Sequence, residues 1–248
     1  MSRLDQQARH DPVRNRRRFG VRAGIAFGCA LLFAVLAALV RSAAGPVLRT
    51  DRATDDTLHG FALRHAGFTS AMRVVSDVGT TPAWIVILAP VVGWLLYRRL
   101  PKLAVFVVVT AAGSSLLNNA IKLLVGRARP HLADPVAVAA GKSFPSGHSQ
   151  AAIVGYAILV AVFLPAAPRG RKPWLVVPAV LMVLLIGFSR IALGVHYLSD
   201  VIGAYLIGTV WFLGMAAAFG AWRRDEGKPT PAVAEGLEPD QGDRLTPG

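Results

Sequence analysis

The chain of 248 residues is 54% hydrophobic and only 17% charged, and its mean hydropathy of +0.48 excludes an ordinary soluble domain. Its net charge of +13 would suit a nucleic-acid-binding protein. No basic surface with interleaved aromatic residues accompanies that charge, so we predict no nucleic-acid partner. The single cysteine, Cys29, excludes an intrachain disulfide and a cysteine metal site.

Long apolar runs determine the fold class. The first, residues 21–40, has the roughly 20 residues that a bilayer-spanning helix needs. It is longer than the apolar core of a signal peptide, so we expect a retained span. Five further apolar runs follow, at about 83–97, 103–124, 150–165, 174–193 and 199–219. We therefore predict an all-α polytopic membrane bundle with about six transmembrane helices.

The basic residues predict the orientation of this bundle. An arginine-rich arm, residues 1–20, precedes the first span, and short basic loops lie at 97–102 and 168–173. The positive-inside rule puts all three on the cytoplasmic side of the cell membrane. The domain of about six spans then covers 21–220. The tail, 221–248, is rich in Pro, Gly and acidic residues and is predicted to be a disordered cytoplasmic segment.

The first external segment, residues 41–82, is too long for a bare turn. Some of its apolar residues loosely follow helical spacing: Leu58, Phe61, Ala62, Phe68, Met72 and Val75. The segment fits a short helix lying in the membrane interface and an irregular connecting loop equally well.

The third span carries a polar stripe on one helical face, made of Ser115, Asn118, Asn119 and Lys122. Polar side chains at membrane depth normally face the bundle interior or a wet cavity. Hydrogen bonding between helices accounts for the serine and the asparagines equally well. Lys122 differs from them because it lies at the external end of the span, within reach of an external site.

Arg129 and Pro130 follow Lys122 in the stretch "KLLVGRARP". Gly126 or Pro130 would end the helix and allow Arg129 to turn inward toward Lys122. Two converging cations without a nearby acid favour an anionic ligand, and the donor fork of arginine suits phosphate. Alone, such a pair is more typical of residues that anchor a span in the membrane interface.

The stretch "FPSGH", residues 144–148, comes just before the fourth apolar run. Ser146 can cap the helix that follows, and Gly147 lets backbone N–H groups approach a ligand. A helix N-terminus favours phosphate. Each residue also has a purely structural reading, as a cap, a tight turn or an interfacial polar group.

The stretch "SRIALGVHYLSD" contains Arg190, His196 and Asp200. His196 and Asp200 are one helical turn apart, so the carboxylate can accept a hydrogen bond from the imidazole and leave the other nitrogen free as a base or nucleophile. A structural His–Asp pair is the alternative. The external segments offer no Asp/Glu/His group with metal spacing, so we predict no metal.

The three clusters fall on the same predicted external side. They bring together cations, donors at a helix terminus, two imidazoles and a carboxylate. That combination suits an in-line displacement at phosphorus.

The motifs Lys-x6-Arg-Pro, Pro-Ser-Gly-His and Ser-Arg-x5-His-x3-Asp occur in this order within residues 122–200. In these motifs the chain resembles the type 2 phosphatidic acid phosphatase family, the lipid phosphate phosphatases related to vanadium haloperoxidases. The resemblance implies a metal-independent membrane enzyme without a cofactor. Its substrate would be a lipid phosphate or diphosphate, such as phosphatidic acid or undecaprenyl diphosphate.

The resemblance also implies roles for individual residues. His196 would attack phosphorus and form a phosphohistidine, with Asp200 fixing its tautomer. His148 would protonate the leaving oxygen and then deprotonate water. Arg127 lies in the variable part of the first motif and is assigned no role. The phosphoryl oxygens would be bound by Lys122, Arg129, Ser146, Gly147 and Arg190.

Two other functions fit the same motifs. A lipid-linked phosphotransferase would have the same site and pass the phosphoryl group to another acceptor. A catalytically inactive membrane protein would keep the fold, although intact His148, His196 and Asp200 argue against it.

Overall fold

The computed structural model describes residues 12–132, 134–225, 237 and 241–245, and within these ranges every regular element is a helix. This confirms the predicted all-α class. The long helices are α2 (Pro12–Arg41), α3 (Gly45–Arg64), α4 (Ala66–Val78), α5 (Thr81–Tyr97), α6 (Pro101–Val125), α7 (Gly147–Phe163), α8 (Pro173–Ala192) and α9 (Leu198–Asp225). A 3₁₀ turn, η1, covers Arg169–Arg171, and a short helix, α10, covers Gln241–Leu245.

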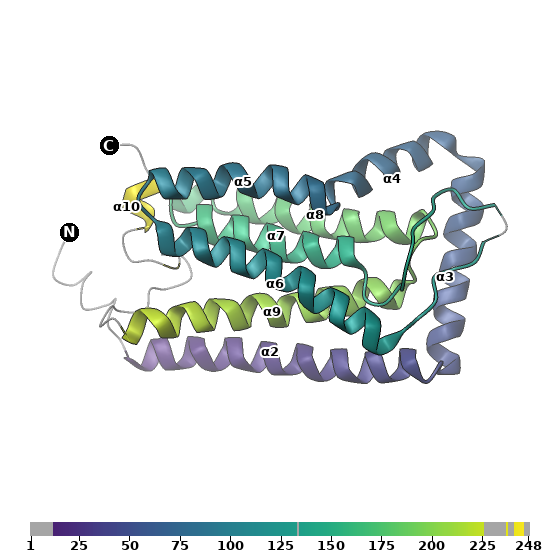
Figure 1. Cartoon of the computed structure of the whole chain (residues 1–248), viewed down its shortest axis with the longest axis horizontal. Helices are drawn as coiled ribbons and strands as arrows, with labels where there is room; N and C mark the ends of the chain where they lie inside the picture. Colours follow the sequence, from purple (N-terminus) through teal and green to yellow (C-terminus); the bar gives the residue numbers. More distant parts are fainter. Residues whose placement is uncertain (1–11, 133, 226–236, 238–240, 246–248) are drawn as a thin grey trace.

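The apolar helices form an elongated bundle in which α7 is central (Figure 1). It packs against α5, α6, α8 and α9, while α2 packs chiefly on α9. Among the described residues, four helices are long and apolar enough to cross a membrane, namely α6, α8, α9 and the Gly20–Arg41 part of α2. The bent pair α4–α5, with an angle of 47°, adds a fifth candidate, and α7 is a shorter apolar helix of 17 residues. The chain is therefore a multi-pass membrane protein.

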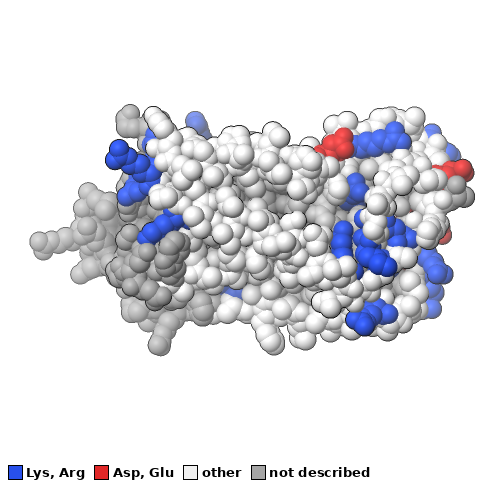
Figure 2. Space-filling view, viewed as in Figure 1, with Lys and Arg blue, Asp and Glu red and all other residues white. Residues whose placement is uncertain are grey.

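Charged residues lie toward the two ends of the bundle, and the band between them is almost free of charge on the face seen in Figure 2. Leu116, Leu123, Val86 and Leu184 are among the apolar side chains exposed on the bundle. Such a surface suits the hydrocarbon of a bilayer. The α6–α7 loop and the α8–α9 turn bring the candidate site to the end of the bundle opposite α10.

The segment 41–82, predicted to be external, is largely helical. α3 lies across the end of the bundle, and α4 leads from it into α5 (Figure 1). The side chains that α3 buries include the two acids Asp51 and Asp55. A buried carboxylate needs a partner, and Asp51 finds its partners at the candidate site.

The tail differs from the prediction of a disordered segment in two places. α9 continues to Asp225, and residues 241–245 form α10. The side-chain amide of Gln241 donates to the carbonyl oxygens of Ala161 (3.1 Å) and Val162 (2.8 Å), which lie in the last turn of α7. Leu245 is buried against the core. Composition did not reveal these two anchors, and the rest of the tail and residues 1–11 of the basic arm lie outside the described residues.

Candidate active site

The end of α6 places the first group of cations. Gly126 ends the helix in the left-handed conformation, with φ at 70°, and its N–H donates to the Lys122 carbonyl at 3.0 Å. This conformation costs glycine little. Lys122 therefore lies in the last helical turn. Arg129 follows in the loop, where the chain turns back over the site.

The start of α7 places the second group. Ser146 is the N-cap, its hydroxyl accepting from the Ser149 N–H at 3.4 Å, and it is fully buried. Its own N–H donates to the Asp200 carbonyl at 3.1 Å, which ties α7 to α9. The hydroxyl is thus engaged in the helix cap and does not face the cavity described below. Gly147 does line that cavity, and a Cβ there would lie only 3.8 Å from Lys122 Nζ.

The turn between α8 and α9 holds the His–Asp pair. His196 Nδ1 lies 3.3 Å from Asp200 Oδ2, and the same oxygen accepts the Tyr197 N–H at 3.0 Å. Asp200 is the third residue of α9, so its carboxylate caps the helix that carries it. Burial lowers the pKa of His196 to about 4, although Asp200 opposes that shift. The imidazole is therefore neutral near pH 7.

Arg129 covers the other nitrogen of His196. Its NH1 donates to the Val195 carbonyl at 2.7 Å and lies 3.0 Å from His196 Nε2. Its Nε donates to the carbonyls of Ala140 and Gly141, both at 3.1 Å. Burial lowers the pKa of the Arg129 guanidinium, but arginine remains charged in proteins. Because a guanidinium only donates, Nε2 must present its lone pair, which is the form that a nucleophile needs.

Arg190 approaches the same space from α8. Its NH1 donates to Ser76 Oγ of α4, and its buried Nε has no hydrogen-bond partner among the described residues. A buried donor without a partner is costly, so this N–H is available to an anionic ligand. Within the described part of the chain, no three His, Cys, Asp or Glu side chains are grouped so that they could hold a metal ion.

These groups meet in one cavity of about 980 Å³ between α5, α6 and α7. Its lining includes most of the predicted site residues, namely Lys122, Arg129, Gly147, His148, Arg190 and His196. Asp200 lies behind His196 and is fully buried. The structure thus collects in one place three motifs that the sequence separates by up to 78 positions, from Lys122 to Asp200.

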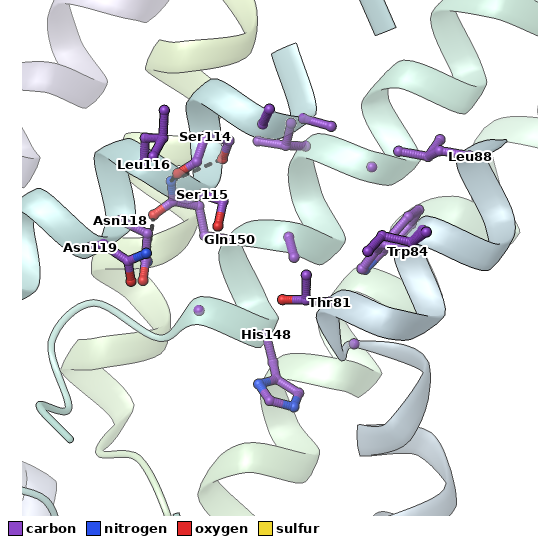
Figure 3. Close-up of a pocket in the computed structure, with 18 of the residues that line it drawn as sticks. Thr81, Trp84, Leu88, Ser114, Ser115, Leu116, Asn118, Asn119, His148 and Gln150 are labelled. Atoms are coloured by element: carbon purple, nitrogen blue, oxygen red, sulfur yellow. Dashed lines mark hydrogen bonds between the residues drawn. The ribbon is translucent and has the colours of Figure 1, made fainter. Parts of the chain in front are cut away.

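The remainder of the cavity is a largely apolar groove along α5 and α6, lined in part by Trp84, Leu88 and Val108. Figure 3 shows His148 near Thr81 and Trp84, with the polar stripe of α6 on the other side. That stripe divides into two parts. Asn118 bonds to Gln150 Oε1 of α7 at 2.9 Å, whereas Ser115 and Asn119 are exposed and line the groove. Hydrogen bonding between helices therefore accounts for Asn118, whereas Ser115 and Asn119 line a cavity.

Sequence reasoning missed several contributors. Arg127 forms buried ion pairs with Asp51 of α3 (2.6 Å) and with Asp200 (2.7 Å). Gly79, between α4 and α5, lies so close to His148 that a Cβ there would be 3.2 Å from the histidine Cβ. The run "GRAR" did place Arg127 two residues before the motif residue Arg129, which could have marked it as a second candidate cation. Nothing in the sequence linked it to Asp51.

The chain is similar to several known proteins. A sequence model of the PAP2 superfamily matches residues 103–224. Phosphatidylglycerophosphatase B of Bacillus subtilis (strain 168) is 26% identical over 185 residues, which is 73% of this chain and 88% of that protein. Undecaprenyl-diphosphatase BcrC of the same organism is 30% identical over 159 residues, which is 62% of this chain and 76% of that protein.

A solved structure is also similar. The crystal structure of a transmembrane PAP2-type phosphatidylglycerolphosphate phosphatase from Bacillus subtilis superposes with a TM-score of 0.69 at 25% sequence identity. The match covers 78% of this chain and 94% of that one.

Proposed function

This chain belongs to the PAP2 superfamily of membrane lipid phosphatases, and we propose that it hydrolyses a lipid phosphate through a phosphohistidine on His196. One observation carries the proposal. A single cavity joins a neutral His196, three cations and His148 to an apolar groove that opens along the membrane-spanning helices. A phosphate headgroup fits the cationic end, and a lipid chain fits the groove.

In the first step, the phosphate takes over the donors of Arg129, and His196 Nε2 attacks phosphorus. The N–P bond forms as the P–O bond to the lipid breaks. The negative charge of the bound phosphate offsets the cations around His148 and favours its protonation. The leaving oxygen takes this proton, and the lipid alcohol departs. Lys122, Arg129 and Arg190 stabilise the negative charge on the phosphoryl oxygens, while the Asp200 carboxylate stabilises the positive ring of the phosphorylated histidine.

In the second step, His148 accepts a proton from water and the oxygen attacks phosphorus. The N–P bond breaks, inorganic phosphate leaves, and Nε2 regains its lone pair. Each step uses only groups of the chain, the lipid and water. The mechanism therefore requires no metal ion.

For the substrate, we favour a phospholipid phosphate over a prenyl diphosphate. Ser115 and Asn119 line the groove below the cations, and neither side chain has a hydrogen-bond partner among the described residues. At 1.5 Å of rise per residue, Asn119 lies about 4.5 Å below Lys122 along α6. Glycerol and ester oxygens of a phospholipid phosphate would lie at that depth and accept from the amide. The similarity to phosphatidylglycerophosphatase B, which is matched over 88% of its length, also favours this substrate class.

For the orientation, we propose that the site faces the external or periplasmic side of the cell membrane and that both termini are cytoplasmic. The basic loops at 97–102 and 168–173 lie at the end of the bundle opposite the site. The positive-inside rule assigns that basic end to the cytoplasm.

The test is phosphate release by purified protein in detergent with EDTA present. Phosphatidylglycerol phosphate, phosphatidic acid and undecaprenyl diphosphate are compared side by side. We expect release from the two phospholipids, no dependence on added metal, and loss in His196→Ala but not in the exposed control Asp56→Asn. A ³²P-labelled, acid-labile phosphoprotein should be trapped in the wild type only. Activity that survives in His196→Ala, or that appears only with an added acceptor lipid, would overturn the proposal.

A further inference from the structure

α3 contributes a buried carboxylate to a part of the site that the proposed chemistry does not use. Asp51 is only 2% exposed. Its Oδ1 accepts the Ser199 N–H at 3.0 Å, and its Oδ2 accepts the Ser199 hydroxyl and Arg127 NH2, both at 2.6 Å. Ser199 is the second residue of α9. Asp51 therefore binds the helix that carries Asp200, and the arginine that pairs with Asp200.

Arg127 links the two carboxylates. One of its nitrogens binds Asp51, and the other donates to Asp200 Oδ1 at 2.7 Å and to Ser199 Oγ at 2.6 Å. Its guanidinium carbon lies 4.1 Å from the centre of the Tyr197 ring, which holds it from one face. Burial lowers the pKa of Arg127, but Asp200 and Asp51 outweigh that effect and raise it. The guanidinium is thus a fixed positive charge between two acids.

We propose that Asp51 and Arg127 are positioning residues for the reaction, holding the Asp200 carboxylate so that Oδ2 stays on His196 Nδ1. With Oδ1 taken by Arg127 and the helix start held by Asp51, the carboxylate cannot rotate away from the imidazole. The first external segment is then part of the catalytic apparatus through α3. This inference rests on the proposed nucleophilic role of His196.

The same network sets the charge behind His196. Asp200 on α9 favours the protonated ring, whereas Arg129 and Arg190 oppose it from the α6–α7 loop and from α8. His148 on α7 and Lys122 on α6 also line the cavity with His196. Asp51 offsets part of the Arg127 charge. Loss of Asp51 should therefore disfavour protonation of His196, because Arg127 would no longer be balanced.

The test compares two variants. Asp51→Asn removes the negative charge and keeps the side-chain shape. Arg127→Lys keeps the positive charge but loses the two separate nitrogens that bind Asp51 and Asp200. Both should lower kcat by roughly 10- to 100-fold, since small misplacements of reacting groups cost that much. KM should stay within about twofold, because neither side chain lines the cavity. The acid limb of the kcat/KM profile should move to lower pH in Asp51→Asn and stay in place in Arg127→Lys. The substrate titrates identically in every variant, so differences between variants report the enzyme.

Asp56→Asn and Arg52→Lys are the matched controls, because both residues are exposed on α3, and both variants should behave as wild type. A folded Asp51→Asn with wild-type kcat and an unmoved acid limb would overturn the inference. If Asp51→Asn does not fold, the inference is tested with Ser199→Ala, which removes the hydroxyl that donates to Asp51. A lower kcat with a similar melting temperature supports the inference, and an unchanged kcat refutes it. An active His196→Ala would instead show that the proposed chemistry itself is wrong.

Discussion

Replacing Asp200 by asparagine tests how the site stabilises the proposed intermediate. Phosphorylation of His196 Nε2 makes the ring positive while Nδ1 keeps its proton, 3.3 Å from Asp200 Oδ2. At an effective dielectric constant of about 20, unit charges at that separation attract by about 5 kcal/mol. Arg127 lies 2.7 Å from the other oxygen and already neutralises part of the carboxylate. We therefore expect a loss of about 4 kcal/mol, or roughly 1,000-fold in kcat.

The assay is phosphate release at saturating lipid in detergent, with kcat and KM measured separately. KM should change little, because Asp200 is fully buried behind His196. Asp56→Asn is the control for the chemical change, and melting temperatures check that each variant is folded. A folded Asp200→Asn that keeps more than about a tenth of the wild-type kcat would refute this electrostatic argument, since such a loss corresponds to less than 1.4 kcal/mol.

Four further predictions concern other parts of the site. Because the pKa of His196 falls from 6.5 to about 4 on folding, its contribution to stability is complete above pH 6.5 and is lost as the pH falls to 4. The loss is about 3 kcal/mol, and thermal unfolding of His196→Asn should show a smaller drop between pH 7 and pH 4. Arg129→Ala should lower kcat/KM by about 100- to 1,000-fold, measured by phosphate release. Asn119→Leu should lower kcat/KM for phosphatidic acid by about tenfold, measured by phosphate release. Inorganic phosphate at 100 times its Kd should stabilise the protein by about 2.7 kcal/mol, seen as a higher melting temperature, and Arg190→Ala should reduce that gain.

Local signals in the sequence predicted the parts of the site that depend on neighbouring residues. Gly126 ends α6, as its place after Lys122 indicated, and Ser146 caps α7. The four-residue spacing of His196 and Asp200 predicted their contact, because one helical turn brings such residues together. Apolar runs of sufficient length predicted the helices themselves, since a membrane requires that backbone groups bond within each segment.

Contacts between distant segments could not be predicted in this way. Asp51 and Arg127 are 76 positions apart, and only the placement of α3 across the bundle end brings them together. The sequence also left two roles open for Ser146, a helix cap and a phosphate ligand. In the structure its hydroxyl accepts the Ser149 N–H and so caps α7. The sequence placed Gln150 in an apolar run without a partner. In the structure it bonds to Asn118 and Ser114 and so joins α7 to α6.

The separation of charge across His196 explains why the two halves of the imidazole would act differently. On the cavity side lie Lys122, Arg129 and Arg190, none with an acidic partner within ion-pair distance among the described residues. On the other side lie the two carboxylates of Asp51 and Asp200, joined by Arg127. A phosphate entering the cavity would therefore meet a net positive charge, and the Nδ1 proton a net negative one, since two carboxylates outweigh Arg127. In the proposed mechanism, the field that draws phosphorus toward Nε2 also stabilises the ring that becomes positive when it attacks. The three cations repel one another until phosphate arrives, so the folded site is electrostatically complete only with its substrate bound.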